Sequence, residues 1–225
     1  MDNSKILTGD SYMTFIKAKK AIYLLCKRII DIIISLVGLI LLLPVTIIVK
    51  IAYMCTGDFN SIFFTQDRIG KDGKIFKFYK FRSMVPNADE VLFKKLAEDE
   101  KLREEYSMNK KLKNDPRITK IGRIIRKSSI DEMPQFINIF LGDMSLIGNR
   151  PYLPREKKDM GKAYDTILRT KPGLTGYWQT SGRSDLSFKK RLELEKYYSE
   201  HSGFKLDIKI FFKTFKVLLS GKGAD

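Results

Sequence analysis

The sequence predicts an α/β chain that is mostly helical, with few short strands and an apolar helix near its N-terminus. Residues 32–49 form one uncharged run, IIISLVGLILLLPVTIIV, in a chain in which 30% of the residues are charged. The segments that follow combine helical spacing of apolar residues with one hairpin signal, and they lack the strand–helix alternation of a parallel sheet. We therefore expect an N-terminal arm at residues 1–20, a membrane element at 21–55 and one soluble domain at 56–225.

The apolar run is long enough to enter a membrane. Its 18 residues, at 1.5 Å each in a helix, come close to the ~30 Å of a bilayer's hydrocarbon core. Pro44 removes one helical hydrogen bond and clashes with the carbonyl of Ile40, and Gly38 loosens the same stretch. We therefore expect the helix to break or kink near Leu43-Pro44. The run does not fit a cleaved signal peptide, whose apolar region is normally shorter and followed by small residues.

The charges around the run favour a hairpin. Several lysines and arginines precede it, and Lys50 directly follows it. Positive charge marks the cytoplasmic side of a membrane helix, and here both ends carry that mark. A re-entrant helix that bends at Pro44 and leaves by the same face satisfies both ends. A kinked span and a buried core helix are the alternatives.

Composition narrows the class of partner. The net charge of +16 and the pI near 9.7 favour a polyanion, which can be nucleic acid, an acidic membrane face or a phosphorylated substrate. The two cysteines, Cys26 and Cys55, lack metal-ligand spacing, and we expect them to be unpaired. The single histidine, His201, excludes a multi-histidine metal site. No Gly-rich fingerprint of a Rossmann fold or P-loop occurs.

Turn and helix signals define the soluble domain in order. Asp72-Gly73, within RIGKDGKIFKFYKF, predicts a β-hairpin. Asn87 with Glu90 matches a capping box that opens a helix to about Tyr106. A short amphipathic helix follows around residues 121–127.

Three further helices complete the domain. One is expected at about 134–141, where Gly142 ends it, and another at 188–198. The last, at 206–219, is basic and amphipathic, as helices at a membrane interface are.

The densest group of chemically active side chains is RKSSIDEMPQ, residues 126–135. Pro134 is tolerated in the first turn of a helix, so we expect the helix to start close to Asp131. Asp131 and Glu132 then lie at a helix N-terminus, and Ser129 with Glu132 matches a capping box. An acidic first turn is the simpler interpretation.

The charges around this acidic pair suggest a second interpretation. Upstream of the pair lie Arg123, Arg126 and Lys127, which supply positive charge. Carboxylates that attract a metal, beside bases that bind phosphate, are typical of phosphoryl chemistry. A carboxylate in such a place can also act as a nucleophile and become an acyl phosphate in a two-step transfer.

Two loops and one helix add candidates. GNRP presents Arg150 and GYWQTSGRS presents Arg183, and arginine binds phosphate oxygens bidentately. Tyr177-Trp178 can stack on a nucleobase, although a structural or interfacial role is the simpler interpretation. Asp207 is an acid in an otherwise basic segment, for which a surface salt bridge is the simpler interpretation.

Taken together and in order, the motifs resemble the bacterial sugar transferases known as monotopic phosphoglycosyl transferases. The matching pieces are KRIIDIIISLVGLILLLP, FTQDRIGKDGKIFKFYKFRSM, DPRITKIGRIIRKSSIDEMPQFINIFLGDMSLIGNRP, KPGLTGYWQTSGRS and LDIKIFFKTFKVLLSGKGA. The resemblance implies a small, minimal catalytic form, with a re-entrant membrane helix, interfacial amphipathic helices and a compact cytosolic catalytic domain. It also implies transfer of a sugar 1-phosphate from a UDP-sugar to undecaprenyl phosphate, with magnesium as cofactor.

The resemblance assigns roles to the acidic residues. Asp131 is the expected nucleophile, which attacks the sugar-linked phosphate of the UDP-sugar, becomes a covalent phosphosugar intermediate and expels UMP. Glu132 is expected to hold Mg²⁺ beside Asp131 and to help activate the lipid phosphate. Asp207 is expected to help position the metal site.

The resemblance also assigns roles to basic residues and to the membrane element. Arg150 and Arg183 are expected to bind substrate phosphates, and Arg126 to support the acidic pair. Pro44 is expected to be the break of the membrane hairpin. Two positions depart from the family's pattern: Leu43 replaces a common serine before that proline, and Asn149 replaces a common proline before Arg150.

The implied partners are a UDP-sugar, undecaprenyl phosphate and membrane lipid, without nucleic acid. The implied location is the bacterial cytoplasmic membrane, with the catalytic domain on its cytoplasmic face, and the implied pathway is assembly of a polysaccharide such as a capsule or exopolysaccharide. TSGRS favours a hexose donor, UDP-glucose or UDP-galactose. The sequence does not fix the oligomeric state, for which a homodimer is one option. The alternative function is a non-catalytic basic protein that binds acidic membranes or nucleic acid.

Overall fold

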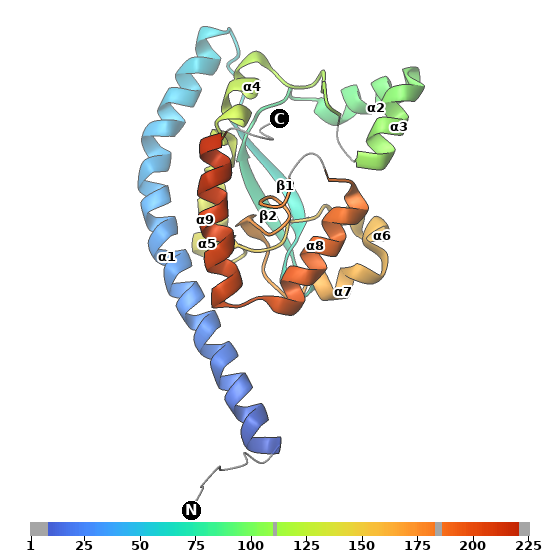
Figure 1. Ribbon diagram of the computed structural model, residues 1–225. Coiled ribbons are helices and arrows are strands. Elements are labelled where there is room, and N and C mark those ends of the chain that lie inside the picture. The colour runs from blue at the N-terminus through green and yellow to red at the C-terminus, as the bar shows by residue number, and fades with distance from the viewer. Residues whose placement is uncertain (1–8, 110–111, 183–185, 221–225) are drawn as a thin grey trace, which may run out of the picture.

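The computed structural model describes residues 9–109, 112–182 and 186–220. One long helix, α1 (Gly9–Cys55), lies along a domain of shorter helices that surround a β-hairpin (Figure 1). The fold class is as predicted, mostly helical with few short strands. The remaining strands and α-helices, given with one of the 3-10 turns, are in order β1 (Phe63–Ile69), β2 (Ile75–Phe81), α2 (Ala88–Glu98), α3 (Glu100–Asn109), α4 (Lys120–Lys127), the 3-10 turn (Ile130–Glu132), α5 (Gln135–Leu141), β3 (Ser145–Ile147), α6 (Lys157–Met160), α7 (Tyr164–Ile167), β4 (Gly173–Thr175), α8 (Phe188–His201) and α9 (Phe204–Ser220).

Helix α1 does not have the form that the sequence predicted. It begins at Gly9, within the residues expected to form an N-terminal arm. It also continues through Pro44 without interruption, so the expected break at Leu43-Pro44 is absent and the re-entrant hairpin is not confirmed.

The packing of α1 explains why it stays continuous. Several of its residues, among them Leu42, Val49 and Tyr53, are buried against the domain on both sides of Pro44. Pro44 itself lies on the exposed side of the helix. The hydroxyl of Thr46 donates to the carbonyl oxygen of Leu42 at 2.7 Å. Contacts on both sides of the proline therefore hold one helical axis, although the proline costs one backbone hydrogen bond.

Gly38 marks a close approach between α1 and α5. A Cβ atom at Gly38 would lie 2.5 Å from ring carbons of Phe136, a distance that only a shift of the ring or of one helix could relieve. The two helices make an extensive contact, which a larger residue at position 38 would disturb. The glycine that was expected from sequence to loosen the helix is therefore a packing position.

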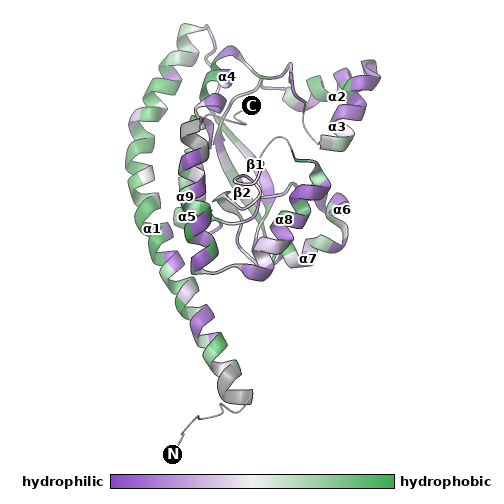
Figure 2. Ribbon diagram, in the orientation of Figure 1, coloured by the Kyte–Doolittle hydropathy of each residue, from purple (hydrophilic) through white to green (hydrophobic). Residues whose placement is uncertain are grey.

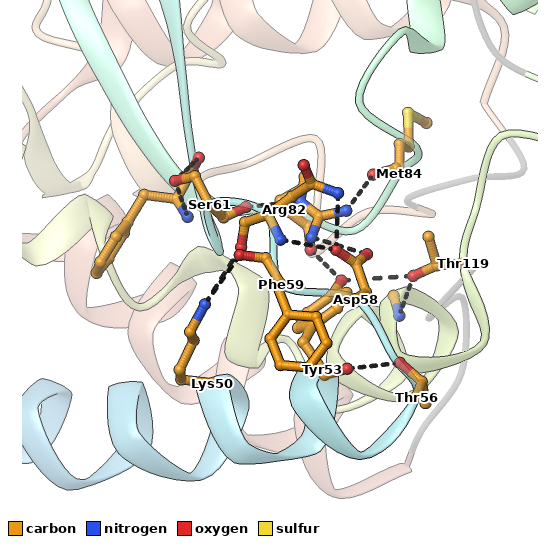
Figure 3. A network of polar contacts seen from close by, with 12 residues as sticks. Lys50, Tyr53, Thr56, Asp58, Phe59, Ser61, Arg82, Met84 and Thr119 are labelled. Atoms are coloured by element: carbon orange, nitrogen blue, oxygen red, sulfur yellow. Dashed lines mark hydrogen bonds and ion pairs between the residues drawn. The ribbon is translucent and has the colours of Figure 1, made fainter.

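Polar contacts anchor the C-terminal end of α1 (Figure 3). The Tyr53 hydroxyl donates to the carbonyl oxygen of Arg82, and the Arg82 guanidinium pairs with Asp58 at 2.9 Å. Arg82 also donates to the carbonyl of Ser61 at 2.7 Å. Buried donors and acceptors are satisfied here by partners far apart in the sequence, and these contacts join α1 to the end of the β1–β2 hairpin.

The face of α1 that does not pack against the domain is apolar and exposed. The upper part of α1 is mostly coloured as hydrophobic in Figure 2, and only 22% of the helix's most apolar 18-residue window is buried. Exposed side chains on this face include Ile40, Leu43 and Ile48. A buried core helix would not leave so much apolar surface in water, so α1 is suited to contact with a membrane.

The strands agree with the predicted hairpin. β1 and β2 pair antiparallel over seven residues each, and Asp72 and Gly73 in the connection both have positive φ angles, 56° and 80°. A second pair, β3 and β4, is parallel, and β3 contacts α9. α5 and the 3-10 turn both pack against β2 of the hairpin.

The helices agree with the predictions except in one place. α4, α5, α8 and α9 lie where apolar spacing predicted them. The helix expected from Asn87 to Tyr106 is divided into α2 and α3 because Asp99 has an extended backbone. The Asn87 side chain makes no capping hydrogen bond, so the capping box predicted there is not formed.

Candidate functional site

The acidic pair lies on the 3-10 turn between α4 and α5. Ser129 precedes the turn with a φ angle of 57°, in the left-handed region, and its side chain caps no backbone N–H. The predicted capping box is therefore absent. The turn ends before Pro134, which precedes α5, and so Asp131 lies in a separate turn instead of the first turn of α5. A non-glycine residue in the left-handed region is strained, and such residues cluster at functional sites.

Asp131 and Glu132 share one lysine. The Lys80 ammonium, on β2, lies 3.5 Å from an oxygen of Asp131 and 3.0 Å from an oxygen of Glu132. Asp131 is buried, whereas the Glu132 side chain is 38% exposed. Burial raises the pKa of the Asp131 carboxyl above its ordinary value, and Lys80 opposes this shift. The sequence did not indicate Lys80, because nothing in the strand IFKFYKF marks one lysine as facing the turn.

The pair opens into a cleft of about 710 Å³. Several buried polar atoms on its walls have no hydrogen-bond partner among the described residues: Arg68 Nε, Gln135 Nε2, Arg150 Nε, Trp178 Nε1 and Gln179 Oε1. Unsatisfied buried polar groups are rare in proteins, and they indicate contacts that a polar ligand or solvent completes. The cleft is therefore suited to a ligand with many acceptor oxygens.

Arginines give the cleft its positive charge. Arg126 and Arg150, two of the sequence candidates, both line it, and their roles toward substrate phosphates stay predictions. Arg68 and Arg191, which the sequence did not indicate, line it as well. Arg68 donates to the carbonyl of Pro151 at 2.9 Å, and burial lowers its pKa to about 9. Arg183 lies outside the described residues, so its place relative to the cleft stays a prediction.

A buried glutamate fixes the loop that carries Arg150. One oxygen of Glu195 accepts from the Arg150 backbone N–H at 2.7 Å, and the other accepts from the Tyr152 hydroxyl. Asn149, which precedes Arg150, donates to the carbonyl of Ile167 at 3.0 Å and to the hydroxyl of Ser199 at 2.6 Å. These bonds hold the loop although Asn149 replaces the more common proline.

The family of this chain follows from its similarity to known proteins. A model of the family described as "Bacterial sugar transferase" matches residues 22–221. The chain belongs to this family. The match includes most of α1, the 3-10 turn, the arginine-lined cleft and α9, so it covers every part of the candidate site.

Curated relatives of this sugar transferase include proteins of two lengths. It is 44% identical over 198 residues to the undecaprenyl-phosphate galactose phosphotransferase of Salmonella typhimurium, and 42% identical to the UDP-galactose-lipid carrier transferase of Erwinia amylovora. Each alignment covers 88% of this chain but only 41% of the relative. The exopolysaccharide production protein ExoY of Sinorhizobium fredii is 38% identical, with 88% of this chain and 87% of ExoY aligned.

The Asp207 carboxylate of this sugar transferase is already occupied by other side chains. One oxygen accepts from Lys27 Nζ at 2.5 Å and from the Tyr23 hydroxyl at 2.9 Å, and the other accepts from the Tyr198 hydroxyl at 2.9 Å. These donors come from α1 and α8. The arrangement does not favour a metal at Asp207, whose part in a metal site stays a prediction. An exposed surface salt bridge does not describe the residue either, since Asp207 is buried.

The acidic pair itself fits a magnesium ion better. In the described part of the chain, no three His, Cys, Asp or Glu side chains form a metal-binding group. Mg²⁺, however, commonly binds one or two carboxylates together with substrate phosphates. Glu132 and Asp131, facing an arginine-lined cleft, match that smaller donor set.

Tyr177 and Trp178, the two aromatic candidates, differ in their surroundings. Tyr177 stacks on Tyr197, with ring centres 5.4 Å apart, and thus has a structural role. Trp178 lines the cleft, where the Arg191 guanidinium lies 5.5 Å from its ring centre. Cys26 and Cys55 are both unpaired, as expected.

Proposed function

We propose that this chain transfers a sugar 1-phosphate from a UDP-sugar to undecaprenyl phosphate through a covalent intermediate on Asp131. The observation that carries the proposal is the buried Asp131 carboxylate, paired with Glu132 and Lys80 at the wall of an arginine-lined cleft. Family membership and the names of the Salmonella and Erwinia relatives support the reaction class.

In the first half-reaction, an oxygen of Asp131 attacks the phosphorus that carries the sugar. A bond forms between Asp131 and that phosphorus, the phosphoanhydride bond breaks, and UMP leaves with the bonding electron pair. Lys80 holds the attacking carboxylate in its ionised form and offsets the repulsion between two anions. Arg150 and Arg68 offset the charge of the diphosphate.

In the second half-reaction, a phosphate oxygen of the lipid attacks the same phosphorus. The acyl phosphate bond breaks, a new phosphoanhydride bond joins the lipid phosphate to the sugar phosphate, and Asp131 is regenerated. Glu132, partly exposed beside Asp131, orients the incoming phosphate. Mg²⁺, when bound by Glu132 and Asp131, supplies charge neutralisation for the phosphoryl oxygens.

The same proposal includes the sugar and the location. UDP-galactose is the favoured donor, because the Salmonella and Erwinia relatives are named as galactose transferases. The exposed apolar face of α1 contacts the cytoplasmic membrane from its cytoplasmic side. The polar contacts of α1 with the domain support this placement, because a charged domain packed along the helix is costly to move through a bilayer.

A panel of UDP-sugars tests the proposal. The protein, in detergent, is mixed with each donor and Mg²⁺, and UMP is measured first without lipid and then with undecaprenyl phosphate. We expect a burst of UMP, stoichiometric with enzyme, before lipid is added, and continuous turnover afterwards. UMP that appears only when lipid is present would reject the covalent intermediate.

The second candidate is a non-catalytic basic protein, which the net charge of +16 favours. It predicts no UMP from any donor and release from acidic vesicles in high salt, because exposed charges are then screened. Retention on vesicles in high salt, together with UMP release, would reject this candidate.

A further inference from the structure

A second, apolar groove of about 800 Å³ lies between α1 and α9. These two helices run side by side in Figure 1, and the Tyr23 ring of α1 packs edge-on against Phe204 of α9. Phe211, Phe212 and Phe215 of α9 line the groove and are 40%, 68% and 52% exposed. So many exposed aromatic rings along one groove indicate a site for an apolar ligand.

The charged side chains that α1 and α9 contribute to the groove are already paired. Lys27 and Tyr23 both donate to Asp207, and Asp31 accepts from the Leu146 backbone N–H at 2.9 Å. A ligand in the groove therefore meets a surface whose charges are neutralised internally. Hydrocarbon fits such a surface, because it does not have to compete for hydrogen bonds.

The groove and the arginine-lined cleft meet at the acidic pair. Ser129, Glu132, Leu174 and Gln179 line both of them. On one side of Glu132 the walls are basic, and on the other side they are apolar. A molecule with a phosphate at one end and a long hydrocarbon chain at the other matches this change in chemistry.

The groove also reaches the exposed face of α1. Ile30 lines the groove and is also 48% exposed. A chain that leaves the groove at Ile30 therefore continues onto the apolar face of α1 that is suited to the membrane. This continuity favours a membrane-borne ligand over a soluble one.

We propose that the groove between α1 and α9 binds the phosphate-proximal isoprene units of the polyprenyl phosphate acceptor. This inference rests on the proposed function. The acceptor phosphate lies at Glu132, its first isoprene units lie between the helices, and the rest of the chain extends past Ile30 into the membrane. Bulk phospholipid and a second copy of the chain are the competing occupants, which the experiment separates.

Steady-state kinetics with matched variants tests the groove. Ile30→Trp and Ile208→Trp narrow it, whereas Ile33→Trp adds the same bulk to an exposed position of α1 outside the groove lining. We expect the two groove variants to raise the KM for a long polyprenyl phosphate about tenfold, the cost of losing one or two buried isoprene contacts. The Ile33 variant should keep the wild-type KM. Equal KM values in all three variants would overturn the inference.

The lipid-free UMP burst distinguishes failure of the groove from failure of the proposed function. All three variants should release UMP from the donor as the wild type does, because the donor binds in the cleft. A wild-type protein that never releases UMP rejects the proposed function. Normal UMP release with unchanged acceptor KM in the groove variants rejects only the groove.

Photocrosslinking identifies the occupant without turnover. A polyprenyl phosphate with a diazirine in its first isoprene units should label α9 between Phe204 and Phe215, and unlabelled polyprenyl phosphate should reduce that labelling. Equal reduction by phosphatidylglycerol would reject a selective polyprenyl site in favour of bulk lipid. No labelling of α9, in protein that is dimeric in detergent, would indicate that a second copy covers the groove and would overturn the inference.

Discussion

Asp131 and Asp207 are both buried aspartates beside a lysine, yet their surroundings differ. Asp131 is 6% exposed, lines the cleft and has Lys80 Nζ at 3.5 Å. Asp207 is 8% exposed and accepts three short hydrogen bonds, from Lys27, Tyr23 and Tyr198. Burial next to a lysine is thus not enough to identify a nucleophile. The number of bonds that already occupy the carboxylate oxygens separates the two sites.

The difference follows from the elements that carry each residue. Asp131 lies on a short 3-10 turn at the wall of the cleft, with Lys80 Nζ as the cation beside it. Asp207 lies on α9 between α1 and α8, and each of those helices directs a donor at it. A carboxylate that accepts several hydrogen bonds is a weaker nucleophile, because its charge is already stabilised. This difference supports the proposed nucleophile at Asp131 and indicates a structural role for Asp207.

The largest expected effect comes from Asp131→Asn. The amide cannot form the acyl phosphate, so we expect the rate of UMP release to fall about 10⁴-fold or more. Melting temperature should change little, because the amide keeps the shape of the side chain. Asp165→Asn, at an exposed aspartate of α7, is the matched control and should keep wild-type activity. Wild-type UMP release by the Asp131 variant would show that another residue is the nucleophile.

The second prediction tests the other half of the comparison. Asp207→Ala leaves the partly buried Lys27 beside two hydroxyl groups without an anion, and we expect a loss of about 3 kcal/mol in stability. For a chain of this size that corresponds to a fall of roughly 6–12 °C in the melting temperature. The folded variant should still release UMP within a few-fold of the wild-type rate.

Activity and stability together decide the role of Asp207. A variant that melts normally but no longer responds to Mg²⁺ would support the metal-site prediction and contradict the structural one. Asp165→Ala serves as the control for removal of an exposed carboxylate, and it should leave both the melting temperature and the rate unchanged.

Local signals predicted much of this structure. Asp72-Gly73 identified the hairpin, apolar spacing identified α4 and α9, and the Asp131-Glu132 pair was found from its acidic residues beside upstream bases. These features depend on residues a few positions apart, which is the range over which sequence patterns report structure.

Long-range contacts account for what the sequence did not predict. Lys80 reaches Glu132 across 52 positions, and Lys27 reaches Asp207 across 180, so no local pattern marks either pair. Pro44 was expected to break α1, but packing on both sides of it keeps the helix continuous. Tertiary packing overrides local propensity at these positions.

The third prediction sharpens the role of Lys80. Lys80→Met removes the cation and keeps most of the length of the side chain, and we expect UMP release to slow roughly 10–100-fold. The pKa of Asp131 should rise further, because Lys80 now opposes the effect of burial, so the rate should reach its plateau at a higher pH. Lys77→Met, on the same strand but paired with the exposed Asp67, should keep the wild-type profile. A pH profile that does not move would show that Lys80 acts only as packing.

The smallest expected effect concerns a third buried carboxylate, Glu195. Its oxygens accept from the Arg150 backbone and from Tyr152, and burial raises its pKa from 4.5 to about 7. Because the folded state binds this proton more tightly than the unfolded state, protonation stabilises the fold below about pH 4.5 and the benefit is lost as the pH rises through 7. The glutamine in Glu195→Gln cannot titrate. Between about pH 5 and pH 7 the free energy of unfolding should therefore fall by about 2 kcal/mol less in this variant than in the wild type.

Melting curves at both pH values measure this difference. Parallel curves for the two proteins would mean that Glu195 is already ionised in the folded state at the lower pH. In that case the hydrogen bonds from Arg150 and Tyr152 would stabilise the ionised form of Glu195 as fully as the lysines do at Asp131 and Asp207. A neighbouring lysine would then not be needed to keep a buried carboxylate ionised in this protein.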